Sequence, residues 1–169
     1  MQTEDASQSA QQLQIQEKGL IVDTGASSHI LNDRSRFKNF DSPFKPERHS
    51  MELADGKRTF GLAQGRGDEQ VCLIDSEGRR CAATLKKALY IPSFPQGLFS
   101  VKSDTTSGAK VSFDEGKDVF VAPNGTRFNI HVCKRMYYLQ TECDENGVCN
   151  VSHDIQTWHA WVIVIPRTY

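Results

Sequence analysis

Short apolar runs separated by turn residues dominate the chain from residue 18 onward. The turns recur about every 8 to 12 residues, a spacing typical of a mostly β domain that is built from hairpins. The polar stretches "ADGK", "DSEG", "FDEGKD" and "APNGT" carry the Gly, Asn and Asp residues that tight turns favour. The pattern therefore predicts a pair of strands around each of these turns.

Outside the strands, the pattern predicts two short helices and two less regular ends. The helices are "SSHILNDRSRF" at 27–37 and "GLFSVKSDTTSG" at 97–108, the second closed by its final glycine. Residues 1–17 are rich in Gln, Ser and Glu, and this composition predicts a disordered lead or linker. Residues 143–169 end in the apolar run "AWVIVIPRTY", which we interpret as part of an atypical tail.

Charge and composition limit the classes of partner. The 169 residues carry 20 basic and 21 acidic side chains, so no net basic field attracts nucleic acid. No apolar run reaches the roughly 18 to 20 residues of a membrane span, and the polar start does not resemble a signal peptide. We therefore expect a cytoplasmic protein without membrane or direct nucleic-acid partners, whose five cysteines stay as thiols.

An aspartate directly follows an apolar run in "GLIVDTGASSHIL", residues 19–31. A carboxylate at the edge of a core is costly to desolvate, so this position needs an explanation. One interpretation is an edge strand after which Asp23 caps the backbone amides of a turn. The other is a strand that ends in a tight loop and presents one carboxylate for chemistry.

Three motifs in order resemble the retropepsin-like aspartic proteases of copia-type retrotransposon polyproteins. "LIVDTGASSHILND" resembles their active-site signature, and "MELADGKRTFGLAQGRG" and "KKALYIPSFPQGLFSVKS" resemble two later segments. The resemblance implies a protease domain at 18–114 that forms a closed β-barrel half with one or two short helices. It also implies that 115–142 is a β-hairpin segment at the protease-integrase junction and that 143–169 is a truncated integrase lead.

The implied activity is that of an aspartic endopeptidase, in which two carboxylates share one proton and act on a water molecule. This chain has one D-[ST]-G loop, because Asp55 and Asp75 lack the pattern and lie at predicted turns. The resemblance therefore implies a homodimer whose two copies of Asp23 form the dyad. The implied partners are a second copy and a polyprotein or peptide substrate bound in extended form. No cofactor is implied.

The resemblance also implies roles for the neighbours of the catalytic Asp23. Thr24 would link the two loops across the dimer axis, Gly25 would let the backbone approach the substrate, and Ala26 is small for the same reason. Ser27 would hydrogen-bond the loop or the substrate backbone. His29 is expected to be structural rather than catalytic.

The hairpin around "MELADGKRTFGLAQG" holds the place of the flap that closes over the substrate. The alternative is an ordinary surface hairpin. The expected tip consists of Leu53, Ala54, Asp55, Gly56 and Lys57.

The third motif is expected to pack behind Asp23. Gly97 stands where the family pattern usually has Asn, which predicts a weaker start for the helix that follows. The expected core residues of this segment are Leu89, Tyr90, Ile91, Leu98, Phe99 and Val101.

Two alternatives stay open at the level of sequence. The first concerns the tail, which either binds zinc through four residues with unusual spacing or is flexible and holds no metal. The second alternative concerns function: a catalytically idle, host-adopted or degenerate module that keeps the fold for protein interaction. The intact "DTGAS" favours the enzyme. The zinc candidates are Cys143, Cys149, His153 and His159.

Overall fold

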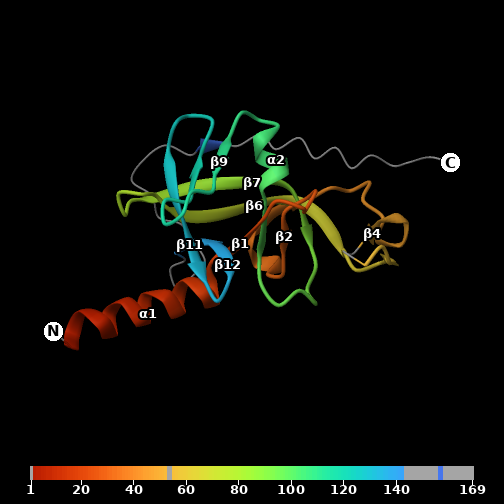
Figure 1. Ribbon diagram of the computed structural model, residues 1–169. Coiled ribbons are helices and arrows are strands. Elements are labelled where there is room, and N and C mark those ends of the chain that lie inside the picture. The colour runs from red at the N-terminus through yellow and green to blue at the C-terminus, as the bar shows by residue number, and fades with distance from the viewer. Residues whose placement is uncertain (1, 53–54, 143–155, 158–169) are drawn as a thin grey trace.

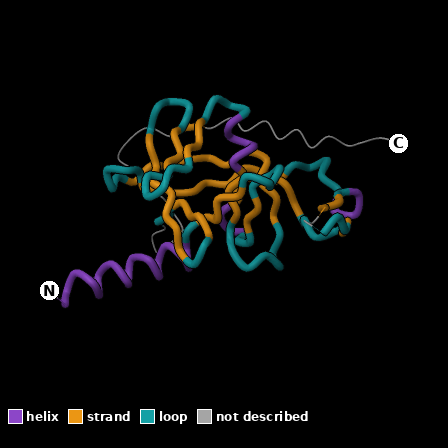
Figure 2. The backbone as a smooth tube through the Cα atoms, in the orientation of Figure 1, coloured by secondary structure: helices purple, strands orange, loops and turns teal. Residues whose placement is uncertain are grey.

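The computed structural model describes residues 2–52, 55–142 and 156–157. Strands are the main regular secondary structure of this part, as Figure 2 shows, and the prediction of a mostly β fold is confirmed. The helices are α1 (Gln2–Lys18), α2 (Val101–Thr105) and the 3₁₀ turns η1 (Arg34–Arg36) and η2 (Pro46–Arg48). The strands are β1 (Leu20–Asp23), β2 (Ile30–Leu31), β3 (Phe37–Phe40), β4 (Ser50–Glu52), β5 (Arg58–Phe60), β6 (Gly65–Ile74), β7 (Arg80–Tyr90), β8 (Leu98–Ser100), β9 (Lys110–Ser112), β10 (Val119–Val121), β11 (Arg127–Cys133), β12 (Met136–Leu139) and β13 (Gln156–Thr157).

Eleven strands form one sheet in the order β3-β6-β7-β2-β8-β1-β12-β11-β10-β9, with β13 paired to β7. The strands β4 and β5 form a separate hairpin, which lies at the opposite end of the molecule from β9 and β11 (Figure 1). Hydrogen bonds among the described strands do not close the path into a ring. The arrangement is compatible with a retropepsin-like half-barrel.

The predicted turns lie between paired strands wherever the structure describes them. "DSEG" joins the two longest strands, β6 and β7, which lie side by side in Figure 1 and pair antiparallel. Gly78 in this turn has a φ of +79°, a backbone conformation that glycine adopts without steric cost. "FDEGKD" joins β9 to β10, and "APNGT" joins β10 to β11.

Two clusters of buried side chains form the core. The larger one includes Phe99, which is fully buried and meets Phe120 edge to face at 5.1 Å. The smaller one lies around Ile91 and contains Leu89 and Leu98. Of the predicted core residues, Leu89, Ile91, Leu98, Phe99 and Val101 are buried, whereas Tyr90 is partly buried.

The predicted helix at 27–37 is wrong. Its residues form β2, η1 and the start of β3. Ile30 pairs with Leu89 of β7 and Leu98 of β8, so pairing with distant strands overrides the helical spacing. The second predicted helix, 97–108, is confirmed only at Val101–Thr105, because its first residues form β8.

A further correction concerns the start of that helix. Ser100, not Gly97, is its N-cap, and the Ser100 hydroxyl accepts a hydrogen bond from the Ser103 amide. The expectation of a weaker helix start at Gly97 is therefore wrong. A Cβ atom at Gly97 would lie 2.6 Å from Cδ2 of Leu20, so the absence of a side chain there lets β1 and the chain before β8 pack closely.

The lead was expected to be disordered, but residues 2–18 form α1. Its Gln, Glu, Ala and Leu residues are good helix formers, and Ile15 near its end is only 3% exposed. The Gln96 side chain also donates hydrogen bonds to the carbonyls of Gln16 and Gly19. From this anchored end the helix extends away from the sheet (Figure 1). Within the described residues, no helix combines the length and apolar character needed to cross a bilayer.

The expectation of five thiols is wrong for Cys72, which is disulfide-bonded. Cys81 and Cys133 are free. The fold brings the chain back beside Cys72 at Glu142, whose amide donates to the Cys72 carbonyl at 3.0 Å. The sequence did not predict that Glu142 lies beside Cys72, because the two residues are far apart along the chain.

Candidate active site

Asp23 is the last residue of β1, a strand in the middle of the sheet order. Leu20 and Val22 point into the core and are buried, and the strand pairs in parallel with β8. The register places Asp23 opposite Ser100, the last residue of β8. The two strands therefore end side by side, and each continues into a loop or helix at the same edge of the sheet.

The Asp23 carboxylate is held by the turn that follows it. Its Oδ1 atom accepts hydrogen bonds from the amides of Gly25 at 2.7 Å and Ala26 at 3.1 Å. These bonds compensate part of the desolvation cost of a carboxylate next to the core. Asp23 is partly exposed, while Thr24 and Gly25 are exposed. The carboxylate thus caps its own turn and also lies on a surface loop, so both features proposed from the sequence are present together.

Two serines at the start of α2 hold the other end of this loop. The Ser100 hydroxyl donates to the Ala26 carbonyl at 2.7 Å, and the Ser103 hydroxyl donates to the Ser27 carbonyl at 3.2 Å. Both serines are buried. Sequence reasoning missed them, because they lie more than 70 residues from the loop and carry no local signal.

His29 is fully buried behind the loop, where a structural role fits its surroundings. Its Nδ1 atom accepts a hydrogen bond from the Ser100 amide at 3.1 Å, and its Nε2 atom lies 3.6 Å from Oδ2 of Asp104. Burial lowers the pKa of His29 to about 3 and raises the pKa of Asp104 to about 7. His29 is therefore neutral over the physiological range.

The hairpin expected to be the flap is present as β4 and β5. Within its tip, Asp55 accepts a hydrogen bond from the Lys57 amide at 2.9 Å, and Gly56 is exposed. The other tip residues, Leu53 and Ala54, lie outside the described residues. At the base of the hairpin, Met51 packs against the smaller core cluster, as Ala26 of the Asp23 loop also does. The hairpin and the loop thus pack against the same apolar cluster.

Comparison with known proteins identifies the family. The model of a family described as "Pol polyprotein, beta-barrel domain" matches residues 20–109, more than half of the chain. The chain belongs to this family. No curated protein and no solved structure matches it. The match therefore indicates a retroelement Pol polyprotein region.

The matched part of the Pol beta-barrel domain runs from the first residue of β1 to the residue before β9. It contains the Asp23 loop, the β4–β5 hairpin and α2. The strands that follow it also pack on the domain, since β12 pairs with β1 through Leu20 and Leu139. The hairpin segment predicted at 115–142 is thus part of the same sheet.

Asp75, the other aspartate weighed from the sequence, has a structural role in the β6–β7 turn. It accepts hydrogen bonds from the amides of Glu77 and Arg79 and forms an ion pair with the Arg79 side chain at 2.7 Å. Burial favours its neutral form, but the bonds from Arg79 and Glu77 outweigh burial and hold the pKa of Asp75 below its usual value. Its carboxylate is therefore occupied in fixing a turn.

No group of His, Cys, Asp and Glu side chains in the described part of the domain is arranged to hold a metal ion. The four residues of the zinc alternative all lie outside that part. They are Cys143, Cys149, His153 and His159.

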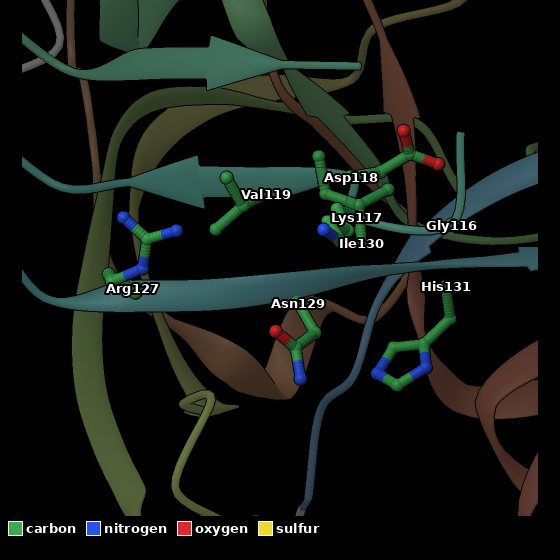
Figure 3. A pocket seen from close by; sticks show the side chains of 8 residues that line it. All are labelled: Gly116, Lys117, Asp118, Val119, Arg127, Asn129, Ile130 and His131. Carbon is green, nitrogen blue, oxygen red and sulfur yellow. The ribbon is translucent and has the colours of Figure 1, made fainter. Parts of the chain in front are cut away.

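A polar groove lies along the β10–β11 hairpin, away from the Asp23 loop in sequence. Figure 3 shows Arg127, Asn129 and His131 spaced along β11, with Lys117 and Asp118 on the preceding segment. None of its lining residues comes from the Asp23 loop or from the β4–β5 hairpin. Sequence reasoning did not single out this groove, whose side chains carry mixed charge.

Proposed function

We propose that this Pol polyprotein domain is an aspartic endopeptidase of the copia-type retropepsin kind, which cleaves its own polyprotein as a homodimer. The observation that carries the proposal is the position of Asp23. Its carboxylate lies at the end of a core strand, is held by two backbone amides, and belongs to a loop with exposed residues. A second copy can therefore approach this edge without unfolding the domain.

In the proposed dimer, Asp23 and the partner's Asp23 share one proton, because two carboxylates a few ångströms apart cannot both ionise. The ionised member takes a proton from a water molecule, which attacks the scissile carbonyl carbon. The protonated member donates its proton to the carbonyl oxygen, which gives a tetrahedral intermediate. The C–N bond then breaks as the carboxyl group that took the proton from water passes it to the leaving nitrogen, and the other carboxylate recovers its proton from the intermediate's hydroxyl group. The amides of Gly25 and Ala26 stabilise the negative charge and fix the carboxylate plane.

The proposed substrate is a polyprotein segment in extended form, bound mainly through main-chain hydrogen bonds. The β4–β5 hairpin is the proposed flap. Two features support this role: it is separate from the main sheet, and its base shares an apolar cluster with Ala26. Phe60 on the hairpin is 61% exposed, which leaves an apolar side chain free for contact with a substrate.

The activity is tested with purified protein and a fusion that carries its flanking polyprotein segments, at about pH 5 to 6 where shared-proton dyads act. Asp23→Asn should abolish cleavage. Asp114→Asn, at an exposed aspartate in the loop after β9, is the matched control and should cleave like the wild type. Cleavage that survives in Asp23→Asn would overturn the assignment of the dyad.

Dimerisation is tested independently by sedimentation velocity over a range of protein concentrations. We expect the sedimentation coefficient to rise from that of a monomer to that of a dimer, and activity to rise in parallel. A strictly monomeric protein at tens of micromolar would contradict the homodimeric site and favour a non-enzymatic module.

A further inference from the structure

Behind the Asp23 loop, a chain of polar contacts leads from α2 to the loop backbone. Asp104 on α2 faces His29, His29 accepts from the Ser100 amide, and the Ser100 hydroxyl donates to the carbonyl of Ala26. Ala26 in turn donates its amide to the Asp23 carboxylate. Each member except Ala26 and Asp23 is buried. Four contacts therefore connect the Asp104 side chain to the Asp23 side chain.

The Ser100 amide determines which nitrogen of His29 carries the proton. A backbone N–H can only donate, so the Nδ1 atom that accepts from it is unprotonated. A neutral imidazole then carries its proton on Nε2, the atom that faces Oδ2 of Asp104 at 3.6 Å. A donor and an acceptor thus face each other at a distance slightly longer than a hydrogen bond.

Neither of these two facing atoms has another partner within the described part of the chain. His29 Nε2 and Asp104 Oδ2 are both buried and lack a hydrogen bond, a costly state for buried polar atoms. The face of the His29 ring is covered by Phe99, with ring centroids 5.0 Å apart. The ion pairs of the described residues bring no other charged group to either side chain, and Lys102 on the same helix is exposed. A small displacement of α2 would bring the two atoms into hydrogen-bond contact.

We propose that Asp104 is a positioning residue that acts through His29 and Ser100 to hold the loop carrying Asp23. The effect of Asp104 on catalysis rests on the proposed function. When Nε2–H donates to Asp104, the imidazole ring is fixed and Nδ1 stays aimed at the Ser100 amide. Ser100 is then held where its hydroxyl meets the Ala26 carbonyl, and the loop keeps the geometry in which its amides reach the Asp23 carboxylate.

Two substitutions at Asp104 separate the hydrogen bond from the titrating charge. In Asp104→Asn, the amide oxygen still accepts from Nε2–H but the side chain does not titrate. In Asp104→Leu, a side chain of similar size has no acceptor. Asp114→Asn is again the control, because that aspartate is exposed on a distant loop.

The first measurement is hydrogen exchange at the amides of Gly25 and Ala26, which needs no enzymatic activity. We expect Asp104→Leu to lower their protection on the order of tenfold, and Asp104→Asn to stay within about twofold of the wild type. The second is steady-state cleavage, where Asp104→Leu should lower kcat on the order of tenfold with little change in KM. Asp104→Asn should restore kcat.

The outcomes distinguish this inference from the proposed function. If Asp104→Leu loosens the loop amides while cleavage does not depend on Asp23, the contact network stands and the protease assignment fails. If cleavage depends on Asp23 but Asp104→Leu changes neither loop protection nor kcat, the positioning role of Asp104 is overturned.

A third measurement covers the case in which Asp104→Leu does not fold. In wild-type protein labelled with ¹⁵N-histidine, His29 should show the Nε2–H form, with a shift that moves near pH 7 as Asp104 ionises. That movement should be absent in Asp104→Asn. An Nδ1–H form, or the same pH dependence in both proteins, would overturn the inference.

Discussion

Substitution of Glu69 by glutamine should make the stability of the domain less dependent on pH. Glu69 lies on β6 and is completely buried, with Oε1 2.9 Å from Nε of Arg36. Burial raises the pKa of Glu69 to about 8, and the opposing attraction of Arg36 is smaller than this effect. The carboxyl group is therefore mostly protonated at neutral pH in the folded protein.

The sign of the effect follows from the proton count. Between its ordinary pKa of 4.5 and the folded value of about 8, Glu69 is ionised in the unfolded chain and protonated in the folded one. Unfolding then releases a proton, so a rise in pH favours unfolding. One proton changes the free energy of unfolding by about 1.4 kcal/mol per pH unit. Glu69 therefore lowers stability progressively through this window.

Glu69→Gln removes this contribution and leaves a neutral side chain of the same size next to Arg36. Urea unfolding of both proteins at pH 5.5 and 7.5, at one fixed protein concentration, measures the difference in free energy of unfolding. Relative to that of the wild type, the free energy of unfolding of the variant should rise by roughly 3 kcal/mol between pH 5.5 and pH 7.5. Glu115→Gln, at an exposed carboxylate in the loop before β10, is the control and should follow the wild-type curve.

One result would refute this reasoning. A difference that does not change between pH 5.5 and 7.5 would mean that Glu69 is ionised in both the folded and the unfolded protein over this range. That would follow if folding left the pKa of Glu69 unaltered, or if the ion pair with Arg36 outweighed burial.

Three further predictions concern packing, and all are measured as free energies of unfolding in urea. Phe99→Ala should destabilise the domain by about 3 to 5 kcal/mol, because Phe99 is fully buried in the larger core cluster. Gly67→Ala should cost at least about 1 to 3 kcal/mol, since its Cβ would lie within van der Waals overlap of the Asn39 carbonyl oxygen on β3. Ile15→Ala should cost about 2 to 4 kcal/mol because Ile15 is buried at the docked end of α1, whereas Leu13→Ala, at a residue 54% exposed, should change stability little.

Local features of the fold were predictable from the sequence, and features set by distant contacts were not. The turn at Gly78 depends on a residue that adopts positive φ freely, so the four-residue sequence "DSEG" is enough to predict it. The segment around Ile30 has helical spacing, yet its structure is decided by β7 and β8, which lie more than 50 residues away. The helix α1 was not predicted because its polar composition is typical of a disordered segment. Its residues are nevertheless good helix formers, and one of them, Ile15, is buried against the domain.

The candidate site shows the same division, and one hydroxyl explains why. The Asp23 turn is local and could be found in the sequence, but the parallel register of β1 and β8 places Ser100 beside it. The Ser100 hydroxyl accepts from the Ser103 amide at the start of α2 and also donates to the Ala26 carbonyl of the loop. A substitution at Ser100 would therefore disturb the helix start and the loop together, and its effect on activity would not separate the two. Asp104 lies two contacts away from Ser100, with His29 between them, and is not the cap. A change at Asp104 therefore tests the support of the loop without removing the helix cap.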